Sequence, residues 1–136
     1  MASKEQLIHA VKELYKARKA RDLDGVMAFT DPTCSYRIVG GERLGAEATK
    51  VDNPITMRQH HEVLMNTWDF CNLQISSIHV DGDTVFVHHA GEISFVPNGA
   101  CFGAEFMDKL TFRNGRLVDV VQFIDTLQAA KVMGIA

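Results

Sequence analysis

Apolar residues recur at helical spacing in the first half of the chain and alternate with polar residues in the second half. The segment "SKEQ" is a capping box in which Ser3 caps and Gln6 returns the bond, so it predicts the start of a first helix. A second, short helix is predicted to begin after the N-cap Asp22, and a third to span residues 55–68. The aligned positions of the first helix are Leu7, Ile8, Val11, Leu14, Tyr15 and Arg18.

The second half of the chain carries runs rich in β-branched and aromatic residues, separated by the turn signals "DGD", "PNG" and "RNG". Short turns between successive runs predict antiparallel hairpins. The sequence therefore predicts one α+β domain over residues 1–136, with helices packed on one face of a strongly bent sheet. The expected strands cover residues 34–39, 71–80, 84–96, 100–113 and 116–125, residues 40–54 form an irregular loop, and "LQAAKVMG" adds a last helical turn.

Composition narrows the possible partners. The 136 residues are 46% hydrophobic and 23% charged with a net charge of -3, so no surface for nucleic acid is expected, and the cations of "KELYKARKAR" are interpreted as a solvated helix face. No apolar stretch approaches the roughly 18 residues that span a bilayer. The start "MASKEQ" has no apolar signal core, so a cytoplasmic protein is expected. Three cysteines without a CxxC or Cys/His pattern indicate reduced thiols and no metal site.

One carboxylate interrupts an apolar strand face. Within "FGAEFMDKLTF", Asp108 shares one side with Phe106 and other apolar residues. If "VPNGA" forms a three-residue loop, His88 lies opposite Asp108, whereas a two-residue loop would place His89 there. The three-residue loop is favoured because the shorter one would make Pro97, which has no N–H, a paired strand residue.

The segment "FRNGR" leaves a similar choice for the last hairpin. A three-residue loop would pair Phe112 with Arg116 and place Val120 opposite Asp108, with Gln122 on the same face. A two-residue type I′ loop would turn two carboxylates of the last strand inward, which costs more to bury. These two residues are Asp119 and Asp125. The longer loop is therefore the preferred interpretation.

The outer face of the predicted sheet is also partly apolar, because it carries Val121 and Phe123. A sheet that is apolar on both faces usually has a partner on the second face. A homodimer through the outer sheet face is therefore expected.

Three stretches resemble a known family. "RDLDGVMAFTD", "YRIVGG" and "DKLTFRNGRLVDVVQFID" are similar to the nuclear transport factor 2-like superfamily, which includes ketosteroid isomerase and the SnoaL-like polyketide cyclases. The resemblance implies a cone-shaped α+β barrel with a deep pocket between a curved sheet and the helices. Members are commonly dimers, and their functions range from isomerases, dehydratases and cyclases to non-catalytic binding proteins.

The family's catalytic residues carry over in part. The resemblance places Asp108 where the isomerases hold a protonated aspartic acid, and Tyr15 lies one residue from the place of their catalytic tyrosine. Arg37 stands where the isomerases have their general base. Gln122 stands where the SnoaL-like cyclases have theirs, so neither reaction transfers directly.

The residues themselves suggest a proton-transfer site. A carboxylate beside His88 would orient the imidazole and raise its basicity, so His88 and Asp108 are the predicted catalytic pair. His60 and His61 are adjacent on a helix, so their side chains point in different directions and cannot both face one site. His61 is the one expected to face inward. The other predicted contacts to a substrate are Tyr15, Arg37, Trp68, Phe86, Phe106, Val120 and Gln122.

Two functions from different classes fit this pattern. The first is an enzyme that isomerises, dehydrates or cyclises a small apolar or polycyclic oxygenated molecule by proton transfer, without a cofactor or metal. The second is a non-catalytic module of the same fold that binds a ligand in the pocket and associates as a dimer. The enzyme is the preferred interpretation.

Overall fold

A computed structural model describes residues 2–45 and 50–135. Within them the helices are α1 (Lys4–Lys19), α2 (Leu23–Ala28), the 3₁₀ helix η1 (Gly41–Leu44), α3 (Pro54–Thr67) and α4 (Thr126–Met133). The strands are β1 (Thr30–Ile38), β2 (Trp68–Asp81), β3 (Thr84–Phe95), β4 (Ala100–Arg113) and β5 (Arg116–Phe123). Most of the helices precede most of the strands, as the sequence predicts, with β1 between α2 and η1 and with α4 after the last strand.

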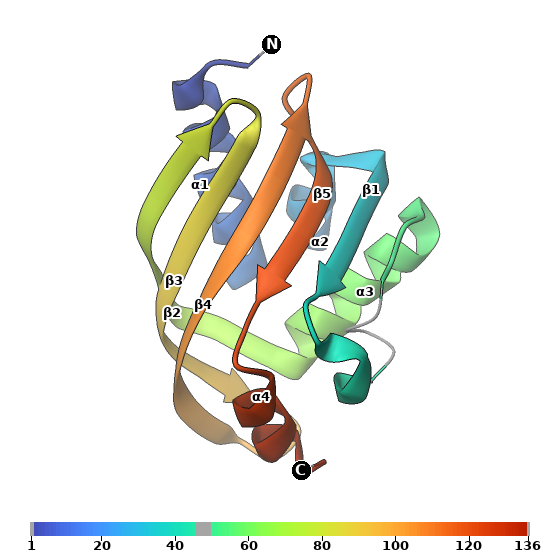
Figure 1. Cartoon of the computed structure of the whole chain (residues 1–136). Helices are drawn as coiled ribbons and strands as arrows, with labels where there is room; N and C mark the ends of the chain where they lie inside the picture. Colours follow the sequence, from blue (N-terminus) through green and yellow to red (C-terminus); the bar gives the residue numbers. More distant parts are fainter. Residues whose placement is uncertain (1, 46–49, 136) are drawn as a thin grey trace.

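The strands form one mixed, strongly curved sheet in the order β1-β5-β4-β3-β2. The pair β1–β5 is parallel, and the other neighbours are antiparallel. Figure 1 shows α1 and α3 across one face of this sheet and α4 at the end where the chain finishes. This is the predicted α+β architecture with an open, cone-like sheet.

The helix ends follow the local sequence. Ser3 Oγ accepts a hydrogen bond from the Gln6 backbone N–H (3.1 Å), and the Gln6 side chain accepts one from the Ser3 N–H (2.8 Å), which confirms the capping box. Asp22 caps α2, also as predicted. The C-terminal segment forms a longer helix than the predicted single turn, and Gly134 ends it in the left-handed conformation.

The hairpin between β3 and β4 differs from the preferred register. Its loop has four residues, 96–99, and Phe95 pairs with Ala100. Asp108 therefore lies opposite Val87, and His89 rather than His88 points to the same face as Asp108. Gly99 does take the left-handed conformation that the turn signal predicts (φ 70°). The extra loop residue changes the register by one, and a shift of one residue reverses the face of every side chain.

The last hairpin has a shorter loop than the preferred one, but the same residues of its second strand face inward. Asn114 and Gly115 both have positive φ, so the loop is the two-residue type, and Arg113 pairs with Arg116. An irregularity between Thr111 and Phe112 then shifts the register. As a result Gln122, not Val120, lies opposite Asp108, but Val120 and Gln122 still lie on the Asp108 face.

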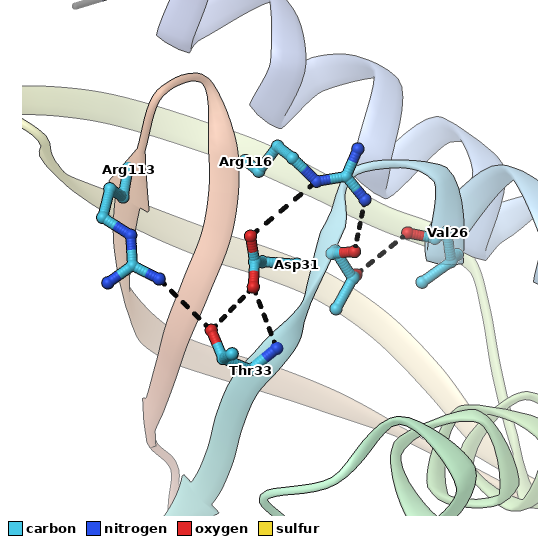
Figure 2. A network of polar contacts seen from close by, with 6 residues as sticks. Val26, Asp31, Thr33, Arg113 and Arg116 are labelled. Atoms are coloured by element: carbon cyan, nitrogen blue, oxygen red, sulfur yellow. Dashed lines mark hydrogen bonds and ion pairs between the residues drawn. The ribbon is translucent and has the colours of Figure 1, made fainter.

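A polar network ties the start of β1 to the β4–β5 hairpin (Figure 2). Asp31 Oδ1 accepts hydrogen bonds from the backbone N–H and the hydroxyl of Thr33, at 2.9 and 2.6 Å. Arg113 donates to the Thr33 hydroxyl (3.3 Å), and Arg116 Nε lies 4.0 Å from Asp31. These contacts fix the first residues of the edge strand β1 to the hairpin. They lie at the end of the sheet that is opposite α4 (Figure 1).

One glycine marks a close approach inside the sheet. Gly91 has a φ of 143°, and a Cβ atom at this position would lie 2.4 Å from the backbone carbonyl oxygen of Asn72. Strand β2 has two irregularities in the pairing with β3, one of them beside Asn72. Such irregularities bend a strand and increase its twist. They therefore accompany the curvature that wraps the sheet around the helices. None of the described helices is both long and apolar enough to cross a membrane.

Candidate active site

A partly open cavity of about 100 Å³ lies between the helices and the concave face of the sheet. Its walls are mostly apolar, and Trp68, the single tryptophan of the chain, is one of them. Polar side chains are present too, and the most buried of them are Arg18, Tyr36, His60 and Gln122. We call these four residues the cavity cluster.

Asp108 belongs to a second group of buried polar residues that does not line the cavity. Its carboxylate is fully enclosed, and its Oδ2 accepts a hydrogen bond of 2.5 Å from the Tyr15 hydroxyl. His89 Nε2 lies 3.2 Å from the same oxygen. Tyr15, His89 and Asp108 come from α1, β3 and β4, and we call them the sealed cluster.

Two side chains separate the sealed cluster from the cavity. Phe106 lines the cavity and stacks on the His89 ring, with 4.7 Å between the ring centroids. Arg18 lines the cavity and lies over the Tyr15 ring, 4.8 Å from its centroid. Burial raises the pKa of Tyr15 well above its usual value, and the Asp108 charge raises it further, so Tyr15 stays a hydrogen-bond donor. The sealed cluster therefore packs against two residues of the cavity wall and does not itself reach the cavity.

In the cavity cluster, Tyr36 and Gln122 hold each other across the parallel strand pair. The Tyr36 hydroxyl donates a hydrogen bond to Gln122 Oε1. Burial is the main cause that raises the Tyr36 pKa, followed by the Asp108 charge, so the phenol remains protonated at neutral pH. The strand alternation of β1 turns Tyr36 inward and leaves its neighbour Arg37 exposed on the other face.

The two adjacent histidines of α3 occupy different surroundings. His60 is 4% exposed and lines the cavity, with its ring centroid 4.0 Å from that of Tyr36. His61 does not line the cavity, although its Nδ1 is buried and has no hydrogen-bond partner among the described residues. Burial lowers the His61 pKa to about 3, helped by the charges of His60 and Arg18. His60 and His61 lie three and four residues after Met57, and both spacings fit one face of a helix. Spacing alone therefore could not show that His60, and not the predicted His61, lines the cavity.

The structure brings together some of the predicted site residues and corrects others. Trp68, Phe106 and Gln122 line the cavity as predicted, and Tyr15 contacts Asp108 without reaching the cavity. The predicted pair of His88 with Asp108 is wrong, because His88 lies on the other face and its Nε2 is 2.6 Å from Glu105 Oε2. The remaining predictions fail for related reasons. Arg37 and Phe86 lie on the opposite face of their strands, and Val120 packs in the core beyond the cavity.

Three cavity residues were missed at the sequence level: Arg18, Tyr36 and His60. A signal existed for Arg18, which continues the apolar spacing of α1 although the run around it was interpreted as solvated. The side chain is instead 8% exposed. For Tyr36 the signal was alternation, because a strand that buries Cys34 must also bury the second residue after it.

The described residues contain no group of three or more His, Cys, Asp or Glu side chains arranged to hold a metal ion. The most buried polar groups of the cavity are instead a guanidinium, an imidazole, a phenol and a carboxamide. Such a set can donate hydrogen bonds, and a neutral imidazole can also accept one.

Comparisons with known proteins agree with this fold. A family model for the SnoaL-like domain matches residues 11–120. A comparison with curated protein sequences found no match. Among solved structures, a proposed isomerase from Bacillus subtilis is 10% identical, with a TM-score of 0.87 and coverage of 100% of this chain and 98% of the other.

Two further structures have the same fold. An NTF2-like protein of unknown function from Burkholderia pseudomallei is 21% identical over 97% of this chain and 98% of the other, with a TM-score of 0.78. AclR, a proposed hydroxylase from Streptomyces galilaeus, is 16% identical over 98% and 88% of the two chains, with a TM-score of 0.74. At these identities the similarity establishes the fold and leaves the chemistry to the residues of the cavity.

Proposed function

We propose that this chain, which belongs to the family of SnoaL-like domains, is an enzyme that moves a proton on a small, largely apolar, oxygenated molecule without a cofactor. The observation that carries the proposal is the cavity itself. It combines apolar walls with buried, convergent polar groups, which is the usual construction of a small-molecule site. Isomerisation, dehydration and cyclisation all consist of proton transfers of this kind.

His60 is the group in the cavity that suits the transfer. Its imidazole is buried among the lining residues and lies against the Tyr36 ring. A neutral imidazole can take a proton from carbon or oxygen and return it elsewhere. Tyr36 stays protonated and is fixed by its hydrogen bond to Gln122, so it offers its hydroxyl in one position. In this proposal His60 is the base, and Tyr36 and Gln122 orient the substrate.

Turnover of a panel of hydroxy-enones and epoxides tests the proposal. We expect His60→Gln to lower kcat by about a hundredfold or more, the usual contribution of a general base. His61→Gln is the matched control, because it changes the next imidazole of α3, which does not line the cavity, and it should keep the wild-type rate. Equal rates for the two variants would exclude His60 as the base.

The alternative is a non-catalytic protein that only binds a ligand in the cavity. The enclosure of Asp108 favours it, since the acid expected to do chemistry does not reach the cavity. This alternative predicts saturable binding without turnover. Affinity would then depend more on the apolar wall, tested by Phe106→Ala and Trp68→Ala, than on His60→Gln.

A further inference from the structure

We infer that the guanidinium of Arg18 binds an anionic oxygen of the ligand, so that the cavity takes small amphipathic molecules ending in a carboxylate or an enolate. The inference deepens the proposed function, on which it rests, because it names the ligand class of the same cavity. It starts from the position of Arg18, which is 8% exposed and lines the cavity near the end of α1.

The hydrogen-bonding capacity of Arg18 is not used by the described protein. Its Nε is buried and has no hydrogen-bond partner among the described residues. None of the ion pairs found among these residues includes Arg18. A buried cation is costly unless an acceptor of opposite charge pairs with it. The cavity is the place from which such an acceptor can arrive.

Two aromatic rings pack against the guanidinium of Arg18. Its central carbon lies 4.1 Å from the centroid of Phe70 and 4.8 Å from that of Tyr15. Ring contacts attract the positive charge but do not satisfy the in-plane N–H donors. A guanidinium fixed in this way presents a planar fork that matches the two oxygens of a carboxylate.

No carboxylate of the described residues forms an ion pair with Arg18. Asp108 does not line the cavity; its Oδ2 accepts the Tyr15 hydroxyl, and its Oδ1 has no hydrogen-bond partner among the described residues. Two acids line the cavity, and both have other partners: Glu105 lies 2.6 Å from His88, and Asp125 Oδ1 accepts from the Gln128 backbone N–H at 3.0 Å. The positive charge of Arg18 is therefore left for a ligand, whose apolar body would lie against the wall that contains Trp68.

Binding of a matched ligand pair tests this inference. The pair is trans-4-butylcyclohexanecarboxylate and its carboxamide, which differ in charge and share an apolar body. Neither absorbs where tryptophan does, so the fluorescence of Trp68 reports binding at pH 7. We expect the wild-type protein to bind the acid at least about tenfold more tightly than the amide, as charge-assisted hydrogen bonds require.

Three variants locate the preference. Arg18→Gln should bring the acid-to-amide ratio close to one, and Arg18→Lys should keep part of it because a point charge remains. Lys16→Gln is the matched control, since it removes an exposed cation from the same helical turn and should keep the full ratio. If Arg18→Gln does not fold, the wild type and Arg18→Lys decide the question.

Several results would overturn the inference. They are equal affinities for acid and amide in the wild type, a preference that survives in Arg18→Gln, or no binding of either ligand at millimolar concentration. An acid preference without turnover of any substrate would instead count against the proposed enzyme and leave the anion site standing. The two proposals therefore fail on different measurements.

Discussion

Two groups of buried polar residues share one side of the sheet but face different surroundings. The sealed cluster of Tyr15, His89 and Asp108 does not line the cavity. A 2.5 Å hydrogen bond joins Tyr15 to Asp108, while Asp108 Oδ1 and His89 Nε2 have no hydrogen-bond partner among the described residues. The cavity cluster is equally buried and also has such an atom, Arg18 Nε, but its members line the cavity. Burial alone therefore does not identify a functional group in this protein. Contact with the cavity distinguishes the group that can meet a ligand from the group that supports the fold.

The largest expected effect is on stability and belongs to the sealed cluster. Asp108→Ala would leave the Tyr15 hydroxyl without its acceptor in a site closed to water. We expect it to lower the free energy of unfolding by about 3 kcal/mol in urea titrations, the usual scale for a broken buried network. Glu105→Gln is the control on the same strand. It should cost less than about 0.5 kcal/mol because that side chain is largely exposed.

Asp108→Asn sharpens the same distinction. If the sealed cluster only supports the cavity, this variant should keep most of the turnover of the wild type once its lower stability is accounted for. A folded Asp108→Asn protein without activity would show that the sealed carboxylate takes part in the chemistry.

The next effect is a pH dependence from His61. Its pKa in the folded protein is about 3, below the value of roughly 6.5 for an exposed histidine, so protonation favours the unfolded state. Its stabilising effect is complete above pH 6.5 and is lost as the pH falls toward 3. At pH 5.5 we expect a loss of about 1 kcal/mol relative to pH 7.

Unfolding measured at several pH values checks this expectation. His61→Gln should flatten the slope between pH 7 and 5.5. His9→Gln, which changes an exposed histidine of α1, should not. Identical slopes in the two variants would assign the pH dependence to other groups.

The smallest expected effect on unfolding concerns the outer face, where the predicted homodimer remains a prediction. Phe123 is 47% exposed there, beside polar contacts such as the His88–Glu105 pair. We expect Phe123→Asp to change the unfolding of the monomer by less than about 0.5 kcal/mol. It should, however, convert a dimer into a monomer in light-scattering measurements. A wild-type protein that is monomeric at high concentration would contradict the dimer.

The sequence predicted the fold well because its signals are local. The capping box at Ser3, the cap at Asp22 and the turn glycines each depend on neighbouring residues, and all of them appear in the structure. Pairing across a loop is different. The turn signal of "PNG" is compatible with three or four loop residues, and this single residue decided whether His88 or His89 faced Asp108.

The site was less predictable because it depends on where helices meet the sheet. Asp108 was recognised as buried, but its distance from the cavity is set by Tyr15 and Phe106, which arrive from other parts of the chain. The cation of Arg18 was assigned to solvent by the charge of its neighbours, although its spacing along α1 already placed it with the apolar residues.

The approach of Gly91 to Asn72 has a consequence for how such a protein can change over time. Any side chain at this position would press on the neighbouring backbone, so the bend of the sheet depends on a residue that cannot be varied freely. Residues that merely line the hollow carry no such constraint. A mutational library that holds position 91 fixed and diversifies the lining should therefore yield many folded variants with new ligand preferences, whereas one that randomises position 91 should mainly yield misfolded chains.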